Sequence, residues 1–383
     1  MEFTISKRHF LRALHRTHAV ADRKNAMPIL SNILLSTDDT ATLRFAATDN
    51  YLGVSATAPA EIRKGGSIAV SAKTLFEVVK NLPEGDVHWT VGPNHGAEIR
   101  AGKARFRLPG MPGNDFPVLA DPGTAVFSTL DVDVVADLIA KTSYSMSTDD
   151  TRPHLAGALF EGEGGMVRMV TTDGHRLSKC EHKLREGLPP ASFSMLVPNK
   201  GISELRRLLE SDGKAERPGK AGDEPTASVV SVAKHGGNAF FRRDGTQLSV
   251  RLAEDQFPPY NKVIPQHQDK RVVVSRTLLV EALKRISLVS NDKSGGVRWM
   301  VEPGSLRVMS ENPDVGEGSE EVDVDYAGPP LTIGFNARYV LDVLNSLSDD
   351  EIALEFAGDL DPGVIRPAND TTLFVGVVMP MRI

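Results

Sequence analysis

One pattern recurs three times along this chain, and it limits the possible folds more than any other feature of the sequence. Near the start, an extended run at Phe3 is followed by Ser6 and by apolar residues at helical spacing: Phe10, Leu11 and Leu14. The same frame returns at constant spacing in two later segments, with Phe127, Val134, Val135 and Leu138, and then Val272, Leu279, Val280 and Leu283. Recurrence on this scale indicates a repeated structural unit. The chain is therefore expected to contain three copies of one domain.

Each copy is expected to combine helices with antiparallel strands, which is an α+β fold. Ser6 and Ser275 are suitable N-cap residues for the first helix, and Asp131 takes that place in the middle copy. Extended runs with alternating apolar residues follow, for example residues 42–46 and 167–170.

A second helical segment begins near Ser71, Pro198 or Asn336 in the three copies. It carries a cation in its first turn, which is Lys73, Lys200 or Arg338. A cation at this end of a helix is unfavourable by about 0.3–1 kcal/mol. Two interpretations stay open, namely an anion outside the protein, or chance at an exposed helix end.

The domain boundaries are predicted from similar closing segments. Residues 115–119 and 256–260 both contain a Phe-Pro pair at the end of a copy. The predicted domains are therefore 1–124, 125–268 and 269–383. Residues 211–228 are polar, with glycine, proline and mixed charge, and a mobile surface insertion in the middle domain is expected there.

The bulk composition is that of an ordinary globular protein, with 40% hydrophobic and 25% charged residues. The sequence has no apolar stretch near the roughly 20 residues that span a bilayer, and its start does not resemble a signal peptide. Cys180 is the single cysteine, which excludes an internal disulfide framework and a cysteine-based zinc site. A cytoplasmic protein without metal or cofactor is expected.

The distribution of charge matters more than the net charge of −6. Residues 7–24 are strongly basic, whereas residues 311–325 contain acidic residues and no basic one. Solvated surface explains either run in isolation. The alternative is a protein with a basic inner face and an acidic outer face.

The segment 171–178 brings Asp173, His175 and Ser178 close together in sequence, which suggests a catalytic triad. Neighbouring residues of a strand point to opposite faces, however, so the three side chains do not readily converge. Asp173 is better interpreted as a turn residue, because Asp49 stands at the equivalent place of the first copy. Phosphate-binding loops and HExxH zinc motifs are missing from the sequence as well. A scaffold or binding protein is therefore favoured over an enzyme.

Several motifs in the right order resemble the bacterial DNA polymerase III β subunit, the sliding-clamp family. They are Thr172–Leu177, Phe257–Pro265, Ile333–Asn336, Tyr339–Leu344 and the C-terminal Val378–Ile383. The resemblance covers the whole chain. It implies three DNA-clamp domains and a head-to-tail homodimer that closes into a ring, with helices lining the hole and antiparallel sheets outside.

The family's role implies a non-catalytic processivity factor that encircles duplex DNA without reading its sequence. The positions implied to contact DNA are Lys24, Lys73, Thr148, Asp149, Arg152 and Lys200. This chain has Pro153 and His154 where the family commonly has aromatic residues. Besides DNA and a second copy of itself, the implied partners are the polymerase III catalytic subunit, a clamp loader, and other polymerases and repair factors.

The family also implies a pocket for short partner peptides with aliphatic or aromatic anchors. It maps to Leu155, Thr172, Gly174, His175, Arg176, Leu177, Pro258, Val263, Val377, Met379, Pro380, Met381 and Arg382. Apolar and methionine side chains suit such a surface. Ordinary packing of a C-terminal strand is the competing explanation for Leu177 and Val377.

The subunit joint is implied at Phe106 and Leu108 of the first copy and at Leu288 and Val289 of the third. Two other functions stay as alternatives. One is a hydrolase acting through Asp173, His175 and Ser178, and the other is a monomeric protein that binds a specific DNA sequence.

Overall fold

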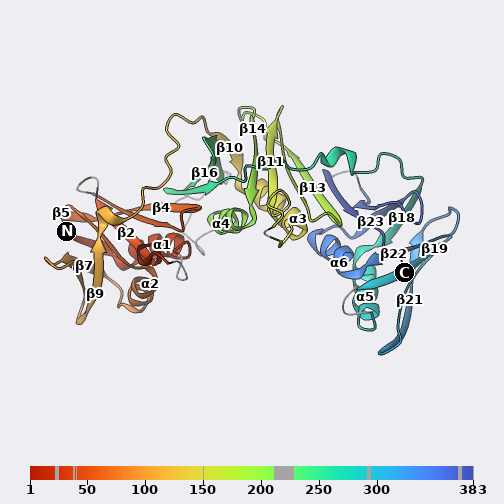
Figure 1. The fold of residues 1–383 in the computed structure, drawn as a ribbon, viewed down its shortest axis with the longest axis horizontal. Helices are drawn as coiled ribbons and strands as arrows, with labels where there is room; N and C mark the ends of the chain where they lie inside the picture. The colour runs from red at the N-terminus through yellow and green to blue at the C-terminus, as the bar shows by residue number, and fades with distance from the viewer. Residues whose placement is uncertain are drawn as a thin grey trace, which may run out of the picture. The chain divides into compact units, whose positions relative to one another are not determined.

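The structure is a computed structural model that describes residues 1–21, 26–37, 39, 41–149, 151–210, 228–290, 295–369 and 373–382. The chain forms two compact units. The first unit comprises Met1–Val132 and Lys200–Leu252, and the second comprises Asp133–Asn199 and Ala253–Ile383. Each unit thus contains one terminal copy of the repeat and half of the middle copy. Each also contains one continuous antiparallel sheet, shown in Figure 1.

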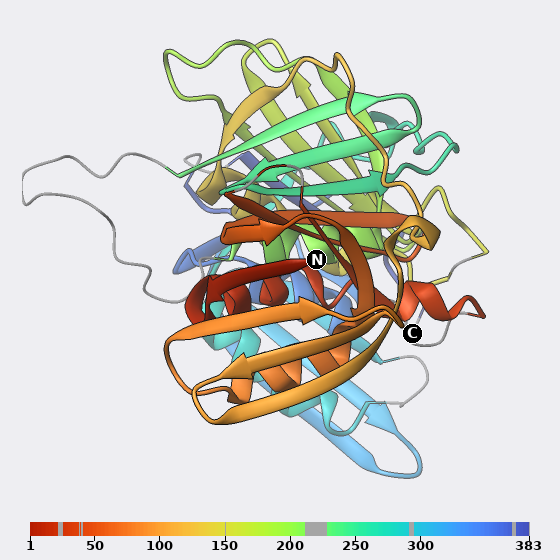
Figure 2. The same cartoon turned by 90° about the vertical axis from the view of Figure 1, so that its left-hand side faces the viewer.

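The first unit is built on a sheet with the strand order β10-β15-β16-β17-β4-β3-β2-β6-β9-β8-β7-β1-β5. Its strands are β1 (Glu2–Ser6), β2 (Asn32–Thr37), β3 (Thr42–Thr48), β4 (Leu52–Pro59), β5 (Glu61–Lys64), β6 (Ser67–Ser71), β7 (Asp86–Val91), β8 (Gly96–Ala101), β9 (Ala104–Pro112), β10 (Ser128–Asp131), β15 (Val229–His235), β16 (Asn238–Arg243) and β17 (Thr246–Arg251). Its helices are α1 (Lys7–Thr17), α2 (Ala72–Asn81) and α4 (Asn199–Leu209). Helices α1 and α2 lie together against the strands (Figures 1 and 2).

The second unit repeats this plan with the strand order β14-β11-β12-β13-β25-β24-β23-β18-β21-β20-β19-β22. Its strands are β11 (Gly157–Glu163), β12 (Met166–Thr172), β13 (Arg176–Lys183), β14 (Phe193–Pro198), β18 (Lys270–Ser275), β19 (Gly296–Glu302), β20 (Ser305–Asn312), β21 (Gly316–Asp325), β22 (Leu331–Asn336), β23 (Glu351–Phe356), β24 (Gly363–Pro367) and β25 (Leu373–Val378). Its helices are α3 (Val132–Thr142), α5 (Arg276–Ser287) and α6 (Ala337–Ser346). Helix α5 packs beside α6 in the same way as α1 beside α2.

Neighbouring copies are joined inside each sheet by one pair of antiparallel strands. In the first unit β17 pairs with β4, from Thr246 opposite Ala56 to Val250 opposite Leu52. In the second unit β13 pairs with β25, with Leu177 opposite Val377. Two copies of the repeat therefore meet along a hydrogen-bonded ladder in each unit.

The predicted strand–helix frame is confirmed in all three copies, because β1–α1, β10–α3 and β18–α5 follow one another directly. The second helices also begin where expected, at Ala72, Asn199 and Ala337. The cap at Ser6 is confirmed, since its side chain accepts a hydrogen bond from the His9 amide. Ser275 occupies the N-cap position of α5 without such a bond.

Aromatic side chains fill the core of each terminal copy. Phe3 stacks on Trp89 with ring centroids 5.5 Å apart, and Phe10 contacts both rings edge-on. In the third copy Trp299 packs edge-on against Phe335 at 5.3 Å. The apolar stripes that identified the repeat are thus the residues that hold each helix on its sheet.

Some predicted features fall outside the described residues, namely Lys24, Ile383 and the insertion apart from Ser228. A hairpin turn joins β11 and β12, where Gly164 and Gly165 have positive φ. Among the described residues, no helix combines the length and apolar character needed to cross a membrane.

Candidate functional site

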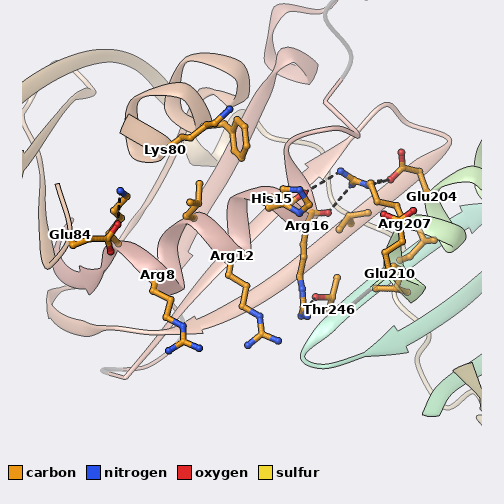
Figure 3. Close-up of a pocket in the computed structure, with 16 residues that line it drawn as sticks. Arg8, Arg12, His15, Arg16, Lys80, Glu84, Glu204, Arg207, Glu210 and Thr246 are labelled. Carbon is orange, nitrogen blue, oxygen red and sulfur yellow. Dashed lines mark hydrogen bonds and ion pairs between the residues drawn. The ribbon is translucent and has the colours of Figure 1, made fainter. Parts of the chain in front are cut away.

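A basic groove of about 720 Å³ lies in the first unit, where α1, α2 and α4 come together above β4 and β17 (Figure 3). Its floor is apolar, formed by residues such as Leu11, Phe76 and Leu248. Its walls carry six cations, which are Lys7, Arg8, Arg12, Arg16, Lys80 and Arg207, against Glu84, Glu204 and Glu210. The groove is therefore a positively charged surface with an apolar base.

The arginines of α1 form one stripe because they are four residues apart, close to one helical turn. Arg8 and Arg12 are exposed and extend side by side from the same side of α1 (Figure 3). Arg16 is less exposed, and it donates hydrogen bonds to the Asp244 carbonyl at 2.6 Å and to Thr246 Oγ1 at 2.9 Å. The stripe thus presents two exposed guanidinium groups and is anchored at its third.

The C-terminal ends of two helices in this unit are covered by arginines. Arg207 of α4 donates to the carbonyls of His15 and Arg16 in the last turn of α1, at 3.2 and 2.9 Å. Arg243 donates in the same way to the carbonyls of Leu208 and Leu209 at the end of α4. Cations are favourable at these ends because the last carbonyls lack helical partners and carry partial negative charge. These arginines fix the helices that carry the groove.

His18 joins α1 to α2 beside the groove. Its ring stacks on Phe76 with centroids 3.9 Å apart, and its Nδ1 lies 2.8 Å from the Leu14 carbonyl. Burial lowers the pKa of His18, because a charged imidazolium would lose its hydration there.

Two of the predicted DNA-contacting lysines are exposed and lie at helix starts in the first unit. Lys73 is the second residue of α2, and Lys200 is the second residue of α4. The Lys200 ammonium pairs with the buried Asp49 carboxylate. This pairing provides an internal anion for one of the three first-turn cations.

The other predicted DNA-contacting residues form a loop in the second unit. Thr148 is exposed. The Arg152 guanidinium donates to Asp149 Oδ2 at 3.0 Å and to the Asp173 carbonyl at 3.3 Å. Hydrogen bonds from Thr151 hold the pKa of Asp149 below its usual value. Arg152 therefore ties this loop to the turn after β12.

The turn after β12 is the predicted one, and it does not assemble a triad. Asp173 Oδ1 accepts hydrogen bonds from the amides of His175 and Arg176 at 2.9 and 3.0 Å. Ser178 Oγ instead donates to the Tyr144 hydroxyl at 2.7 Å. Asp173 and Ser178 are thus engaged with other groups, as expected for a structural turn.

Arg176 is at the centre of a buried network behind this turn. Its guanidinium contacts Asp173 at 3.0 Å, Asp342 of α6 at 2.6 Å and the Tyr144 carbonyl at 2.6 Å, and it lies 4.5 Å from the centre of the Tyr339 ring. Only 9% of Arg176 is exposed. Burial raises the pKa of Tyr144 to about 12, so this ring remains neutral. In this structure Arg176 positions the turn against α6, and its guanidinium is engaged internally.

The remaining predicted pocket residues divide into a buried base and an exposed rim. Leu177 and Val377 are 2% and 1% exposed and belong to an apolar cluster with Tyr260 and Ile264. Leu155 and Thr172 are buried, whereas Pro258, Pro380 and Met381 are half-buried. The rim is formed by exposed residues, namely Gly174, His175, Val263, Met379 and Arg382.

The C-terminal residues run beside this surface. The Met379 amide donates to the His175 carbonyl at 2.9 Å, and the Met381 amide donates to the Gly334 carbonyl at 2.8 Å. The structure therefore brings His175 and Met379 together although they are far apart in sequence. Leu177 and Val377 contribute packing beneath them.

The predicted subunit-joint residues lie on or beside two strand edges. Among the described residues, 104–109 of β9 pair only with β8, and 316–323 of β21 pair only with β20. Phe106 on β9 is 40% exposed and Leu108 is 8% exposed. Leu288 after α5 is 78% exposed, and Val289 packs behind β21 near Gly318.

The two edges carry opposite charges. Strand β9 has Arg105 and Arg107, whereas β21 has the carboxylates Glu317, Glu320, Glu321 and Asp323. An unpaired strand edge is a template for another strand, and opposite charge favours one partner over others.

Several residues of these sites were not predicted from the sequence. The Arg8–Arg12 stripe had a signal in its four-residue spacing within the basic run. Tyr339 and Asp342 lie in a motif that carries the family resemblance, but their contacts with Arg176 had no local signal, because they come from α6; Tyr144 comes from the segment just after α3.

Comparison with known proteins shows which domain families this chain matches. Three domain families match in order: the N-terminal domain of the DNA polymerase III beta subunit over residues 1–120, its central domain over 129–217 and its C-terminal domain over 261–382. The beta sliding clamp of Caulobacter vibrioides is 36% identical over 390 residues, and that of Escherichia coli K12 is 34% identical over 387 residues, each covering 100% of both chains.

Solved structures agree with these relatives. A DNA polymerase sliding clamp from Pseudomonas aeruginosa superposes with a TM-score of 0.90 at 31% identity, covering 100% of both chains. A Caulobacter crescentus beta sliding clamp has the same TM-score at 35% identity and 100% coverage, and was solved with PEG at a region suggested to tether the beta-motif.

The three strand–helix copies and the full-length match to sliding-clamp structures place the chain in the class of DNA clamps, which are not enzymes. The chain belongs to the DNA polymerase III beta subunit family. Its function is that of a sliding clamp, a non-catalytic processivity subunit of the polymerase.

Proposed function

We propose that two copies of this chain close head to tail into a ring around duplex DNA. The observation that carries the proposal is the pair of strand edges at 104–109 of β9 and 316–323 of β21, which have no second neighbour in the described part of the chain and bear opposite charge. Pairing β9 of each copy with β21 of the other forms two identical joints, which leaves neither edge open and closes the assembly. Phe106, Leu108, Leu288 and Val289 supply apolar contacts at this joint.

The ring holds DNA by enclosing it, so its contacts with the duplex remain weak and independent of sequence. Phosphate contacts from lysine and arginine meet this need, whereas base contacts would stop the ring at one site. We assign these contacts to Lys24, Lys73, Thr148, Asp149, Arg152 and Lys200, and we add the exposed Arg8 and Arg12 of α1. Ionic strength should therefore weaken DNA binding strongly.

Partner proteins dock, in this proposal, on the surface around His175 and Met379. The apolar cluster of Leu177 and Val377 supports it from beneath, and Met379 and Val263 supply exposed apolar contacts. Peptides with aliphatic or aromatic anchors fit such a surface. The partners are the polymerase III catalytic subunit, other polymerases, repair factors and a loader that opens the ring.

The domain boundaries that accompany this proposal are 1–124, 125–268 and 269–383. Limited proteolysis tests them, because cleavage concentrates in exposed connections between domains. The proposed location is the bacterial cytoplasm, at the replicating nucleoid.

Retention on DNA tests the ring directly. The chain is loaded onto nicked circular DNA with a clamp loader and ATP, and retention is measured before and after linearisation. A topological ring stays on the circle and leaves the linear molecule. Equal retention on both templates, or tight binding of the free chain to a short linear duplex, would favour the monomeric sequence-specific alternative instead.

A matched pair of variants separates closure of the ring from contact with DNA. Arg107→Glu on the β9 edge should shift the dimer toward monomers in analytical ultracentrifugation and abolish retention on the circle. Arg8→Glu on α1 should leave the dimer intact and weaken only the salt-sensitive binding. A fully dimeric Arg107→Glu protein would contradict the proposed edge pairing.

A further inference from the structure

Three different metal-ligating side chains converge in the second unit, away from the turn and its docking surface. Cys180 and His182 are two residues apart on β13, so they point to the same face of the sheet. Asp137 belongs to α3 and contacts His182 of β13. The three ligand atoms all lie within 4.8 Å of one another.

The contacts within this cluster centre on one carboxylate oxygen. Asp137 Oδ2 lies 2.7 Å from His182 Nε2, 2.9 Å from the Lys141 ammonium and 3.8 Å from Cys180 Sγ. Burial raises the pKa of the Asp137 carboxyl, but hydrogen bonds from His182 and Lys141 outweigh this effect and hold the pKa below its usual value. The Cys180 side chain is fully buried, whereas Asp137 and His182 are about one third exposed.

The donor set and spacing suit one ion in particular. Zinc takes thiolate, imidazole and carboxylate together in a tetrahedron, with bonds of roughly 2.0–2.3 Å that separate neighbouring ligand atoms by about 3.3–3.7 Å. The distance of 3.8 Å between Cys180 Sγ and Asp137 Oδ2 is close to this value. The distance of 2.7 Å between His182 Nε2 and Asp137 Oδ2 must lengthen slightly when the ion binds. The exposed side of Asp137 and His182 leaves room for water as the fourth ligand.

We propose that Asp137, Cys180 and His182 form a zinc site in which the ion takes the place of the Lys141 ammonium. The Cys180 thiol loses its proton to solvent as its sulfur binds the ion, and Lys141 keeps its charge and turns outward. The cluster is neutral before and after this exchange. It holds a carboxylate with an ammonium before, and a carboxylate and a thiolate with a divalent ion after. The ion therefore enters without adding net charge to a partly buried site.

The expectation that the chain lacks a zinc site came from counting cysteines. That argument excludes a site made of several cysteines, but it does not cover one cysteine with two ligands of other types. The Cys-x-His spacing was the available local signal, whereas Asp137 is brought in only by the fold.

A bound ion would fasten α3 to β13. The same two elements are already joined where Arg176 and Ser178 of β13 bond to Tyr144 just beyond α3. Zinc bound between Asp137 of α3 and Cys180 and His182 of β13 would raise the unfolding temperature of the second unit, by an amount that grows with the logarithm of the zinc concentration over its Kd. It would do so without changing the residues proposed for DNA or peptide binding.

Cobalt titration of the untagged, chelator-treated full chain tests the site, because Co²⁺ reports thiolate ligation by its absorption. We expect one ion per chain, an intense near-ultraviolet thiolate-to-cobalt band, visible bands of tetrahedral intensity, and loss of all of these on adding Zn²⁺. His182→Gln should weaken binding by at least about tenfold. Cys180→Ser should remove the thiolate band.

Lys141→Met is the decisive variant, because it removes the competing cation and leaves every ligand in place. It should tighten Co²⁺ binding by roughly tenfold, and it does not depend on whether Cys180→Ser folds. Three results would each overturn the proposal: a spectrum without a thiolate band, binding unaffected by His182→Gln, or weaker binding in Lys141→Met. None of them would bear on the ring, which the DNA-retention experiment tests separately.

Discussion

The turns at residues 48–52 and 172–176 are two copies of one structure placed in different surroundings. In each, the aspartate Oδ1 accepts hydrogen bonds from the amides two and three residues later, at 2.9 and 2.6 Å for Asp49 and at 2.9 and 3.0 Å for Asp173. The preceding threonine hydroxyl donates to a carbonyl four residues on in both copies. The backbone of the turn is therefore fixed by the repeat itself.

The third position of both turns requires a left-handed backbone. Asn50 has φ of 75° and Gly174 has φ of 93°. These are residues that adopt this conformation at low cost. Thr172 and Gly174 are thus explained by the turn, because Thr48 and Asn50 serve the same purpose in the first copy.

The two turns differ in the residues at the start of the next strand. After the first turn comes Gly53, and the Leu119 side chain lies only 3.0 Å from where a Cβ of Gly53 would stand. After the second comes Leu177, which joins the apolar cluster with Val377. In the first copy, the Leu119 side chain therefore fills the space beside Gly53. In the second copy, the strand residue Leu177 fills the equivalent space with its own side chain. We infer that docking depends on the residues after the turn.

The largest difference expected between the two regions concerns the cation beside each aspartate. Arg176 is buried and contacts two carboxylates, whereas the side chain of Lys200 is 63% exposed. Arg176→Met should cost about 3 kcal/mol, because it strands the carboxylates of Asp173 and Asp342. Lys200→Met should cost less, under about 1 kcal/mol, because the Lys200 side chain is largely in water and the single Asp49 carboxylate that it leaves keeps two backbone amide donors.

Scanning calorimetry of the two variants measures this contrast. Arg176→Met should lower the unfolding temperature clearly, and Lys200→Met should change it little. Similar losses in both proteins would show that the two turns are equivalent in energy as well as in geometry.

A smaller effect is expected at the C-terminal end of the strand that joins neighbouring copies in each unit, which is Arg251 at the end of β17 and Met379 just after β25. The amides of Arg251 and Met379 make the same hydrogen bond, to the carbonyls of Tyr51 and His175 respectively. Met379→Ala should weaken a fluorescent peptide with leucine and phenylalanine anchors by about tenfold, which corresponds to roughly 1.4 kcal/mol. The matched Arg251→Ala should leave peptide affinity unchanged.

Fluorescence anisotropy gives both affinities, and circular dichroism checks that both variants fold. Unchanged peptide binding in Met379→Ala, or an equal loss in Arg251→Ala, would contradict the proposal that peptides dock beside β13 and β25 and not beside β4 and β17.

The sequence predicted the features that repeat. The strand–helix frame, the starts of the second helices and the turn at Asp173 follow from local spacing and turn chemistry. Three aligned copies reinforced the first two predictions, and two copies reinforced the turn. The resemblance to a known family supplied the rest of the architecture. The frame, the helix starts and the turn could be predicted because each depends on residues close together in the chain.

The contacts that distinguish the copies were not predicted, because they join distant segments. Asp342 reaches Arg176 only after α6 packs beside β13, and Arg207 covers the end of α1 from α4. The resemblance placed Arg176 among the peptide-contacting residues, and only the fold revealed that its guanidinium is engaged internally. Burial and partner choice are tertiary properties that the local pattern does not contain.

The smallest expected effect concerns the first unit, whose stability should depend on pH through His18. Burial lowers the pKa of His18, which stacks on Phe76 between α1 and α2. The folded state therefore binds fewer protons than the unfolded state. This contribution to stability is complete above the ordinary histidine pKa of about 6.5 and is lost as pH falls through the lowered value. Thermal unfolding at pH 7.5 and 5.5 should thus differ less in His18→Phe than in the unaltered chain. His9→Gln, a change of an exposed histidine on the same helix, serves as the matched control, and an unaltered pH dependence in His18→Phe would contradict this role.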